Sequence, residues 1–122
     1  MSKSDLIILT GMHRSGTSLV ASLLQAAGVN VGKSLLEPDK RNPHGFFEDK
    51  DFYEFHQQAL HRCGELTPYV SADFVFQPTQ AEMDQALSLI QQRNNQPLWG
   101  WKDPRTCLFL DFWGQLLLEA QY

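Results

Sequence analysis

The stretch GMHRSGTS, residues 11–18, lies between an apolar run and an amphipathic segment, and this arrangement decides the fold. Leu6 to Leu9 before it form a nearly continuous apolar run, typical of a central parallel strand that is covered on both faces. After it, apolar residues recur at helical spacing, and Gly28 follows as a C-terminal stop. These apolar residues are Leu19, Val20, Leu23, Leu24 and Ala27. The pattern therefore predicts a strand, a glycine turn and a helix.

The two glycines of this stretch indicate a loop that binds an anion. Gly11 and Gly16 can adopt positive φ and let the backbone approach a ligand, so that N–H groups of the loop and helix converge on it. An ATP- or GTP-binding loop of this spacing carries a lysine and then a magnesium-binding hydroxyl, but here Thr17 takes the lysine position and Ser18 follows. Metal-dependent hydrolysis of a nucleoside triphosphate is therefore disfavoured. Arg14 offers a permanent charge and a fork of donors for phosphate or sulfate oxygens instead.

The segments beyond this helix alternate between loop and regular structure. Val29 to Phe47 is rich in Gly, Pro, Asn and Lys, which is typical of a binding loop, and we expect it on the substrate side. Periodicity predicts helices from Asp49 to Cys63, from a capping box at Thr79 to about Gln92, and over Leu108 to Tyr122.

A second strand is predicted at Leu98 to Lys102. It ends at Asp103 and Pro104, because proline cannot donate to a sheet ladder. Helices that alternate with buried-type strands predict an α/β fold with three layers, α/β/α, around a central parallel sheet. Ligands of such sheets bind beyond the carboxyl ends of the strands, so residues at the end of this strand should point into a cleft.

Composition limits the classes of protein to which the chain can belong. With 122 residues, of which 43% are hydrophobic, it is long enough for one domain with a core. A net charge of -4 argues against a general nucleic-acid or acidic-membrane binder. The N-terminal MSKSD contains no signal segment and no apolar run reaches the length of a membrane span, so we expect a cytoplasmic protein. Cys63 and Cys107 are expected to be buried free thiols rather than a disulfide.

Three blocks of the sequence together resemble the amino-terminal half of the PAPS-dependent sulfotransferases, especially the bacterial type: GMHRSGTSLVASLLQAAGV, NPHGFFED and WGWKDPRT. The resemblance spans most of residues 6–109 and implies a P-loop nucleoside-triphosphate-hydrolase-like domain. It implies 3′-phosphoadenylyl sulfate (PAPS) as sulfonate donor, no metal, and a hydroxyl or amine of a carbohydrate or other metabolite as acceptor. Arg14 would stabilise charge on the bridging oxygen as the sulfuryl group leaves. By the same resemblance, the residues that contact the 5′-phosphosulfate would be His13, Arg14, Ser15, Gly16, Thr17 and Ser18.

The second and third blocks supply candidates for proton transfer and charge stabilisation. The acceptor must lose a proton, and His44 and Glu48 are the candidate bases. Alternatively, Glu48 only favours the start of the next helix and His44 is a solvated loop residue. Lys102 would reach the transferring sulfonate, and Arg105 would meet the nucleotide phosphates or an acidic acceptor. The alternative is that Lys102 and Asp103 form a solvated charged pair and that Arg105 starts the last helix.

The aromatic residues and the end of the chain leave two further expectations. Trp99, Trp101, Phe46 and Phe47 are expected in the core, although they could instead stack on adenine or a sugar ring. The family resemblance also implies a later strand and helix with an Arg and a Ser for the 3′-phosphate, which nothing after Trp113 offers. We therefore expect residues 1–122 to be the amino-terminal part of one such domain, incomplete at its C-terminus; the alternative is a shortened relative that has lost part of the donor site. A non-catalytic nucleotide- or anion-binding module is the alternative, and a P-loop kinase is disfavoured by the absent lysine.

Overall fold

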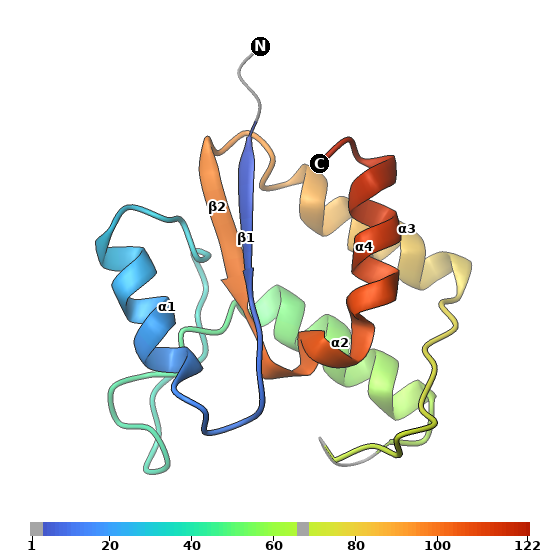
Figure 1. Ribbon diagram of the computed structural model, residues 1–122, viewed down its shortest axis with the longest axis horizontal. Coiled ribbons are helices and arrows are strands. Elements are labelled where there is room, and N and C mark those ends of the chain that lie inside the picture. The colour runs from blue at the N-terminus through green and yellow to red at the C-terminus, as the bar shows by residue number, and fades with distance from the viewer. Residues whose placement is uncertain (1–3, 66–68) are drawn as a thin grey trace.

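Two parallel strands, β1 (Asp5–Leu9) and β2 (Leu98–Lys102), lie at the centre of the structure (Figure 1). The structure is a computed structural model that describes residues 4–65 and 69–122; the first three residues of the N-terminal MSKSD lie outside the described part. The two strands are aligned along their whole length, from Asp5 opposite Leu98 to Leu9 opposite Lys102. Both predicted strands and their parallel direction are confirmed.

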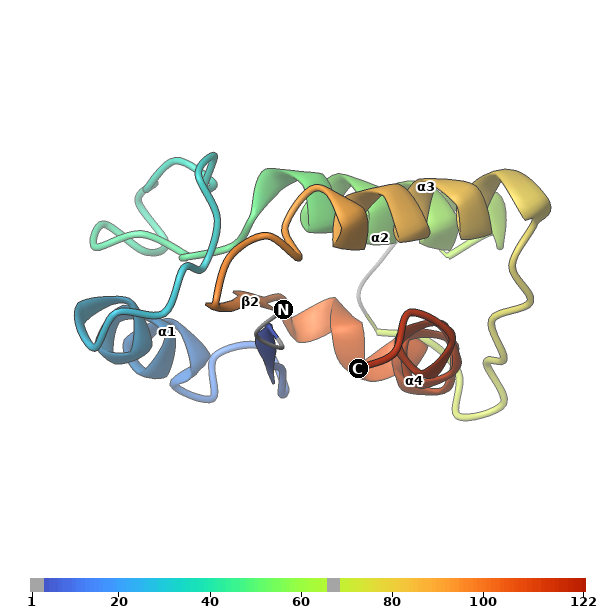
Figure 2. The ribbon, with the colours of Figure 1, turned by 90° about the horizontal axis from the view of Figure 1, so that it is seen from above.

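Four α-helices and one 3₁₀-helix complete the described chain. They are α1 (Thr17–Ala26), α2 (Lys50–Arg62), α3 (Gln80–Gln91), the 3₁₀-helix η1 (Pro104–Phe109) and α4 (Leu110–Glu119). In Figure 2, α2 and α3 lie side by side on one side of the strands, and α1 and α4 lie on the other side at opposite flanks. The α/β class is therefore confirmed, with two strands in the sheet of the described residues.

Local sequence signals explain where these helices begin. Asp49 caps α2, because its side chain accepts a hydrogen bond from the N–H of Asp51 at 3.0 Å. At α3, Thr79 accepts from the N–H of Glu82 and the Glu82 side chain accepts from the N–H of Thr79, as the predicted capping box requires. The last predicted helix instead starts as η1, in which Pro104 occupies the first turn, and continues as α4.

The strand that is covered on both faces is β2, whereas the sequence predicted this for β1. Trp99 through Lys102 are buried, while Leu6 through Leu9 are only half-buried. One edge of β2 pairs with β1 and the other pairs with Asn30, whose N–H and carbonyl bond to Leu98 and Gly100. In the described chain no strand pairs with the outer edge of β1.

Aromatic side chains fill most of the core. The ring of Phe52 stacks on Trp101 with centroids 4.1 Å apart, and Trp113 packs against both rings. Trp99 and Trp101 are each 1% exposed, so their predicted place in the core is confirmed. The prediction for the cysteines is wrong in one respect: both are free thiols, but Cys107 is exposed and Cys63 is only half-buried. Cys107 lies in η1, whose inward positions are taken by Thr106 and Phe109.

The segment of residues 29–47 contains no helix and only isolated β-bridges, as predicted for a long loop. It runs beside α1 and returns to the start of α2 (Figure 1). Within the described residues, no helix combines the length and apolar character that crossing a membrane demands.

Candidate functional site

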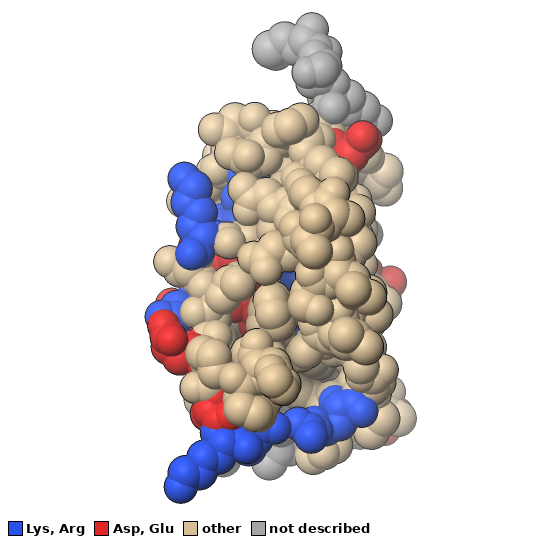
Figure 3. Space-filling model, turned by 90° about the vertical axis from the view of Figure 1, so that its left-hand side faces the viewer, with Lys and Arg blue, Asp and Glu red and all other residues tan. Residues whose placement is uncertain are grey.

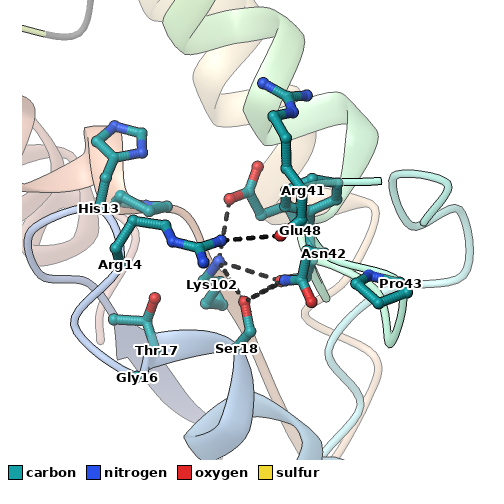
Figure 4. Close-up of a pocket in the computed structure, with 12 residues that line it drawn as sticks. His13, Arg14, Gly16, Thr17, Ser18, Arg41, Asn42, Pro43, Glu48 and Lys102 are labelled. Atoms are coloured by element: carbon teal, nitrogen blue, oxygen red, sulfur yellow. Dashed lines mark hydrogen bonds and ion pairs between the residues drawn. The ribbon is translucent and has the colours of Figure 1, made fainter. Parts of the chain in front are cut away.

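A cavity of about 400 Å³ opens at the carboxyl ends of β1 and β2 (Figure 4). We call it the strand-end cavity. The residues that line it are His13, Arg14, Gly16, Thr17, Ser18, Arg41, Asn42, Pro43, Phe46, Glu48, Lys102 and Pro104. All of them except Arg41 belong to the three sequence blocks that carry the family resemblance. The cavity lies beyond the carboxyl ends of the strands, where α/β sheets bind ligands.

The glycine loop reaches the cavity through a backbone that differs in one respect from the expectation. Gly16 has φ 89°, as predicted, but the second residue at positive φ is Arg14, with φ 64°, and not Gly11. Gly11 is needed for a different reason. A Cβ atom at this position would lie 3.3 Å from both Ser15 Oγ and Thr17 Cγ2, which is tighter than ordinary contact. The small residue therefore lets the loop fold back on itself.

The first turn of α1 faces the cavity and contains no acidic side chain of its own. Gly16, the N-cap, has no side chain to accept from the helix. The whole of α1 lacks charged residues, and Figure 3 shows a broad uncharged surface on this side. Lys and Arg atoms lie at its lower end, where β1 and β2 finish, and also along its left edge beside Asp and Glu atoms. The N–H groups at a helix start attract anions. This helix start is therefore suited to an anion.

Lys102 joins the three blocks at the base of the cavity. Its Nζ donates to Ser18 Oγ at 3.2 Å, to the Phe46 carbonyl at 3.1 Å and to Glu48 Oε1 at 3.0 Å. Figure 4 shows the ammonium between Ser18 and Glu48. Lys102 is 3% exposed, and its partner is Glu48, so the alternative of a solvated pair with Asp103 is wrong. A buried ammonium needs an acceptor for each of its hydrogens, because removing an unpaired charge from water costs much free energy.

Glu48 lies on the cavity wall between two cations. Its Oε1 pairs with Lys102, and its Oε2 lies 3.7 Å from an Arg105 nitrogen. Burial and the nearby charge of Asp103 raise the pKa of Glu48 above its usual value, although Lys102 and Arg105 oppose the rise. The helix start is capped by Asp49, so Glu48 does not serve as that cap.

Arg14 and Arg41 form the exposed rim. The Arg14 guanidinium donates to the backbone carbonyl of Arg41 at 3.0 Å. Arg41 pairs with Asp39 at 2.6 Å, and its guanidinium lies 5.6 Å from the Phe46 ring centroid. The hydrogen bond from Arg41 holds the pKa of Asp39 below its usual range. The sequence reading missed Arg41, although it directly precedes the second block.

His13, which the family resemblance implies as a contact of the phosphosulfate, also lines the cavity. Burial and the positive charges of Arg105 and Lys102 lower its pKa, while Asp103 opposes the change. The imidazole is therefore neutral at neutral pH.

Four predicted site residues are not among those that line the cavity: Gly11, Ser15, His44 and Arg105. Ser15 Oγ donates to the Met12 carbonyl at 2.6 Å, and His44 is exposed in the long loop.

Arg105 lies in η1, ahead of α4, and its guanidinium reaches the cavity-lining Glu48 at 3.7 Å without lining the cavity itself. It donates to Gln57 and Asp103 at 3.1 Å each, and its guanidinium lies 4.7 Å from the Tyr53 ring centroid.

A buried network behind β2 went unnoticed in the sequence. His56 Nδ1 lies 2.8 Å from Asp103 Oδ2, and the Trp113 indole donates to His56 Nε2 at 2.9 Å. Because the indole is only a donor, Nε2 must accept, so His56 is neutral and donates from Nδ1. Burial opposes ionisation of Asp103, but hydrogen bonding from His56 and the charge of Arg105 win, and its pKa is lowered. The network anchors the turn that follows Lys102.

The donors that meet at the cavity are suited to an anion rather than to a cation. Its wall combines an ammonium, two guanidinium groups and the start of a helix. Within residues 4–65 and 69–122, no three His, Cys, Asp or Glu side chains come together as a metal site. Comparison of the chain with protein-family models, curated proteins and solved structures finds no match. Evidence for the function therefore comes from the geometry of the cavity and from the three sequence blocks.

Proposed function

We propose that this chain is the donor-binding part of a PAPS-dependent sulfotransferase with a P-loop-like domain, which transfers a sulfonate group to a hydroxyl or amine of a carbohydrate or other metabolite. One observation carries the proposal. The Lys102 ammonium bonds to Ser18, 84 positions earlier, and to Glu48, so the three blocks that resemble this family surround a single cavity. Residues that resemble a family by chance have no reason to converge in this way.

The chemistry that we propose uses the charges of this cavity. The acceptor oxygen or nitrogen attacks sulfur, the bond from sulfur to the bridging oxygen breaks, and 3′-phosphoadenosine 5′-phosphate (PAP) leaves with the electron pair. Negative charge grows on the bridging oxygen, and Arg14 and Lys102 supply opposite charge at the cavity. The acceptor proton goes to Glu48, which lines the cavity, rather than to His44, which is exposed.

The position of Lys102 also answers why the loop has no lysine of its own. In a Walker loop the hydroxyl at the position of Ser18 binds magnesium, but here it receives the ammonium of Lys102 at 3.2 Å. The positive charge next to the start of α1 thus comes from Lys102 on β2 and not from a lysine of the loop. This arrangement supports a donor without a β,γ-bridging metal.

Isothermal titration calorimetry with PAP, ATP and inorganic sulfate, each with and without magnesium, tests the proposal. We expect PAP to bind without magnesium and more tightly than ATP. Ser18→Ala should weaken PAP binding by roughly 2- to 12-fold, the equivalent of one hydrogen bond. Ser22→Ala is the matched control, because Ser22 lies on the same helix, its hydroxyl donates to the Leu19 carbonyl, and it does not line the cavity.

Two results would contradict this function. Magnesium-dependent preference for ATP would favour a kinase or another nucleotide-binding module. PAP binding that is no tighter than the binding of inorganic sulfate would favour a non-catalytic anion-binding module.

A further inference from the structure

The ammonium of Lys102 and the carboxylate of Glu48 form a buried ion pair in the structure. All three ammonium hydrogens of Lys102 have acceptors, and one of these is Glu48 Oε1 at 3.0 Å. Both groups are almost fully buried, at 3% and 4% exposure, so water screens their interaction poorly. Burial raises the pKa of Glu48, but the ammonium opposes this rise, so the carboxylate accepts a proton less readily than burial alone would allow.

An anion in the strand-end cavity competes directly for this ammonium. Lys102, Arg14 and the first residues of α1 line the same space as Glu48. An anion that binds at the helix start therefore comes close to Lys102 and brings negative charge close to Glu48.

When the Lys102 ammonium moves toward the anion, few other charged groups can stabilise the negative charge of Glu48. The groups that face it are Lys102 from β2, Asp103 and Arg105 from the turn and η1, and Arg41 from the long loop. Arg105 lies farther away, at 3.7 Å, and also serves Asp103. Arg41 is engaged with Asp39.

We propose that the donor anion activates Glu48 by drawing the Lys102 ammonium away from it, so that the proton acceptor becomes competent only after the donor has bound. This inference rests on the proposed function. The ammonium moves from Glu48 toward the oxygen that leaves with the electron pair, and Glu48 takes the proton that the acceptor loses. An acceptor that enters before the donor meets a Glu48 carboxylate that is still paired with Lys102. The donor must therefore bind first and the acceptor second.

A thermodynamic consequence follows without any turnover. Loss of the ammonium and arrival of negative charge both raise the pKa of Glu48, so donor binding takes up protons on the acidic side of neutrality and becomes tighter as pH falls. Adenosine 5′-phosphosulfate is the suitable probe, because it lacks the two phosphate monoesters of PAP, each of which titrates with a second pKa of about 6.

Calorimetry of this probe in buffers of different ionisation enthalpy measures the proton uptake. At about pH 5.5 we expect uptake of a fraction of one proton for each bound probe, which declines toward zero at about pH 8. The uptake should disappear in Glu48→Gln, which keeps the side-chain volume, and should persist in Glu54→Gln, an exposed carboxyl on α2.

Each outcome separates this inference from the function on which it rests. If neither adenosine 5′-phosphosulfate nor sulfate binds, the proposed function fails. If the probe binds to the wild-type protein without proton uptake, or with release, the inference alone is wrong. It is equally wrong if the uptake persists in Glu48→Gln and is abolished in His13→Gln, because His13 would then be the proton acceptor.

Discussion

The two walls of the strand-end cavity differ in how firmly they hold their side chains. At the end of β2, Lys102 and Asp103 are buried, and each makes several hydrogen bonds within the protein. On the glycine loop, Arg14 is exposed and its guanidinium donates to the Arg41 carbonyl. One wall is thus part of the core, while the other is available to a ligand.

This difference separates what stability requires from what binding requires. A buried charge must be paired and hydrogen-bonded, so the β2 wall is organised by folding itself. The exposed Arg14 contributes little to folding and loses side-chain freedom only when it meets a ligand. Substitutions on the two walls should therefore affect different measurements.

The largest effect on stability is expected for Asp103→Ala. It leaves the buried His56 N–H and the Arg105 guanidinium without the carboxylate that accepts from both, and each hydrogen bond to a charged group is worth about 1.5–3 kcal/mol, so the two together predict a loss of roughly 3–6 kcal/mol. Urea denaturation measures the free energy of unfolding. Asp73→Ala is the control, because Asp73 is exposed and should change the same quantity by less than about 0.5 kcal/mol. Equal, small losses in both variants would show that the buried network does not hold the β2 wall.

The opposite result is expected for Arg14→Ala, which should weaken ligand binding and leave stability almost unchanged. The free energy of unfolding should change by less than about 0.5 kcal/mol, because the side chain is exposed. The affinity for adenosine 5′-phosphosulfate should fall roughly 10- to 150-fold, the equivalent of one or more charge-assisted hydrogen bonds. Lys33→Ala removes an exposed cation that does not line the cavity and should leave affinity unchanged. Unchanged affinity in Arg14→Ala would remove Arg14 from the site.

Most elements of the fold were predictable because their signals are local. A capping box at Thr79, a proline after Asp103 and the glycine spacing around Arg14 act within a few residues of the structure that they specify. The same holds for much of the glycine-loop side of the site, since Gly16, Thr17 and Ser18 reach the cavity as consecutive residues.

The parts that the sequence did not predict depend on distant partners. His56 and Asp103 are 47 positions apart, and the one local sign was a histidine on the apolar face of a helix, four residues after Phe52. Periodicity also could not tell which apolar faces are covered. In α1 the predicted stripe is largely exposed, and the buried residues are Thr17 and Ala21.

The smallest effect is expected on this outer face of α1. Leu19, Val20 and Leu23 are exposed there. Leu23→Gln should change the free energy of unfolding by less than about 0.5 kcal/mol, because Leu23 is 61% exposed and little apolar contact is lost. Leu60→Ala, in a residue that is 1% exposed, should cost about 2–5 kcal/mol in the same urea titration.

A loss above about 2 kcal/mol in Leu23→Gln would overturn this reading of α1, since a truly exposed leucine cannot contribute so much. Repeating the titration at several protein concentrations then gives the reason. A loss that grows with concentration means that a second copy of the chain covers the helix, because only a bound partner makes stability depend on concentration. In that case association with a second copy of the chain would stabilise the glycine-loop wall of the cavity. The difference in stability between this wall and the β2 wall would then hold only for the monomer.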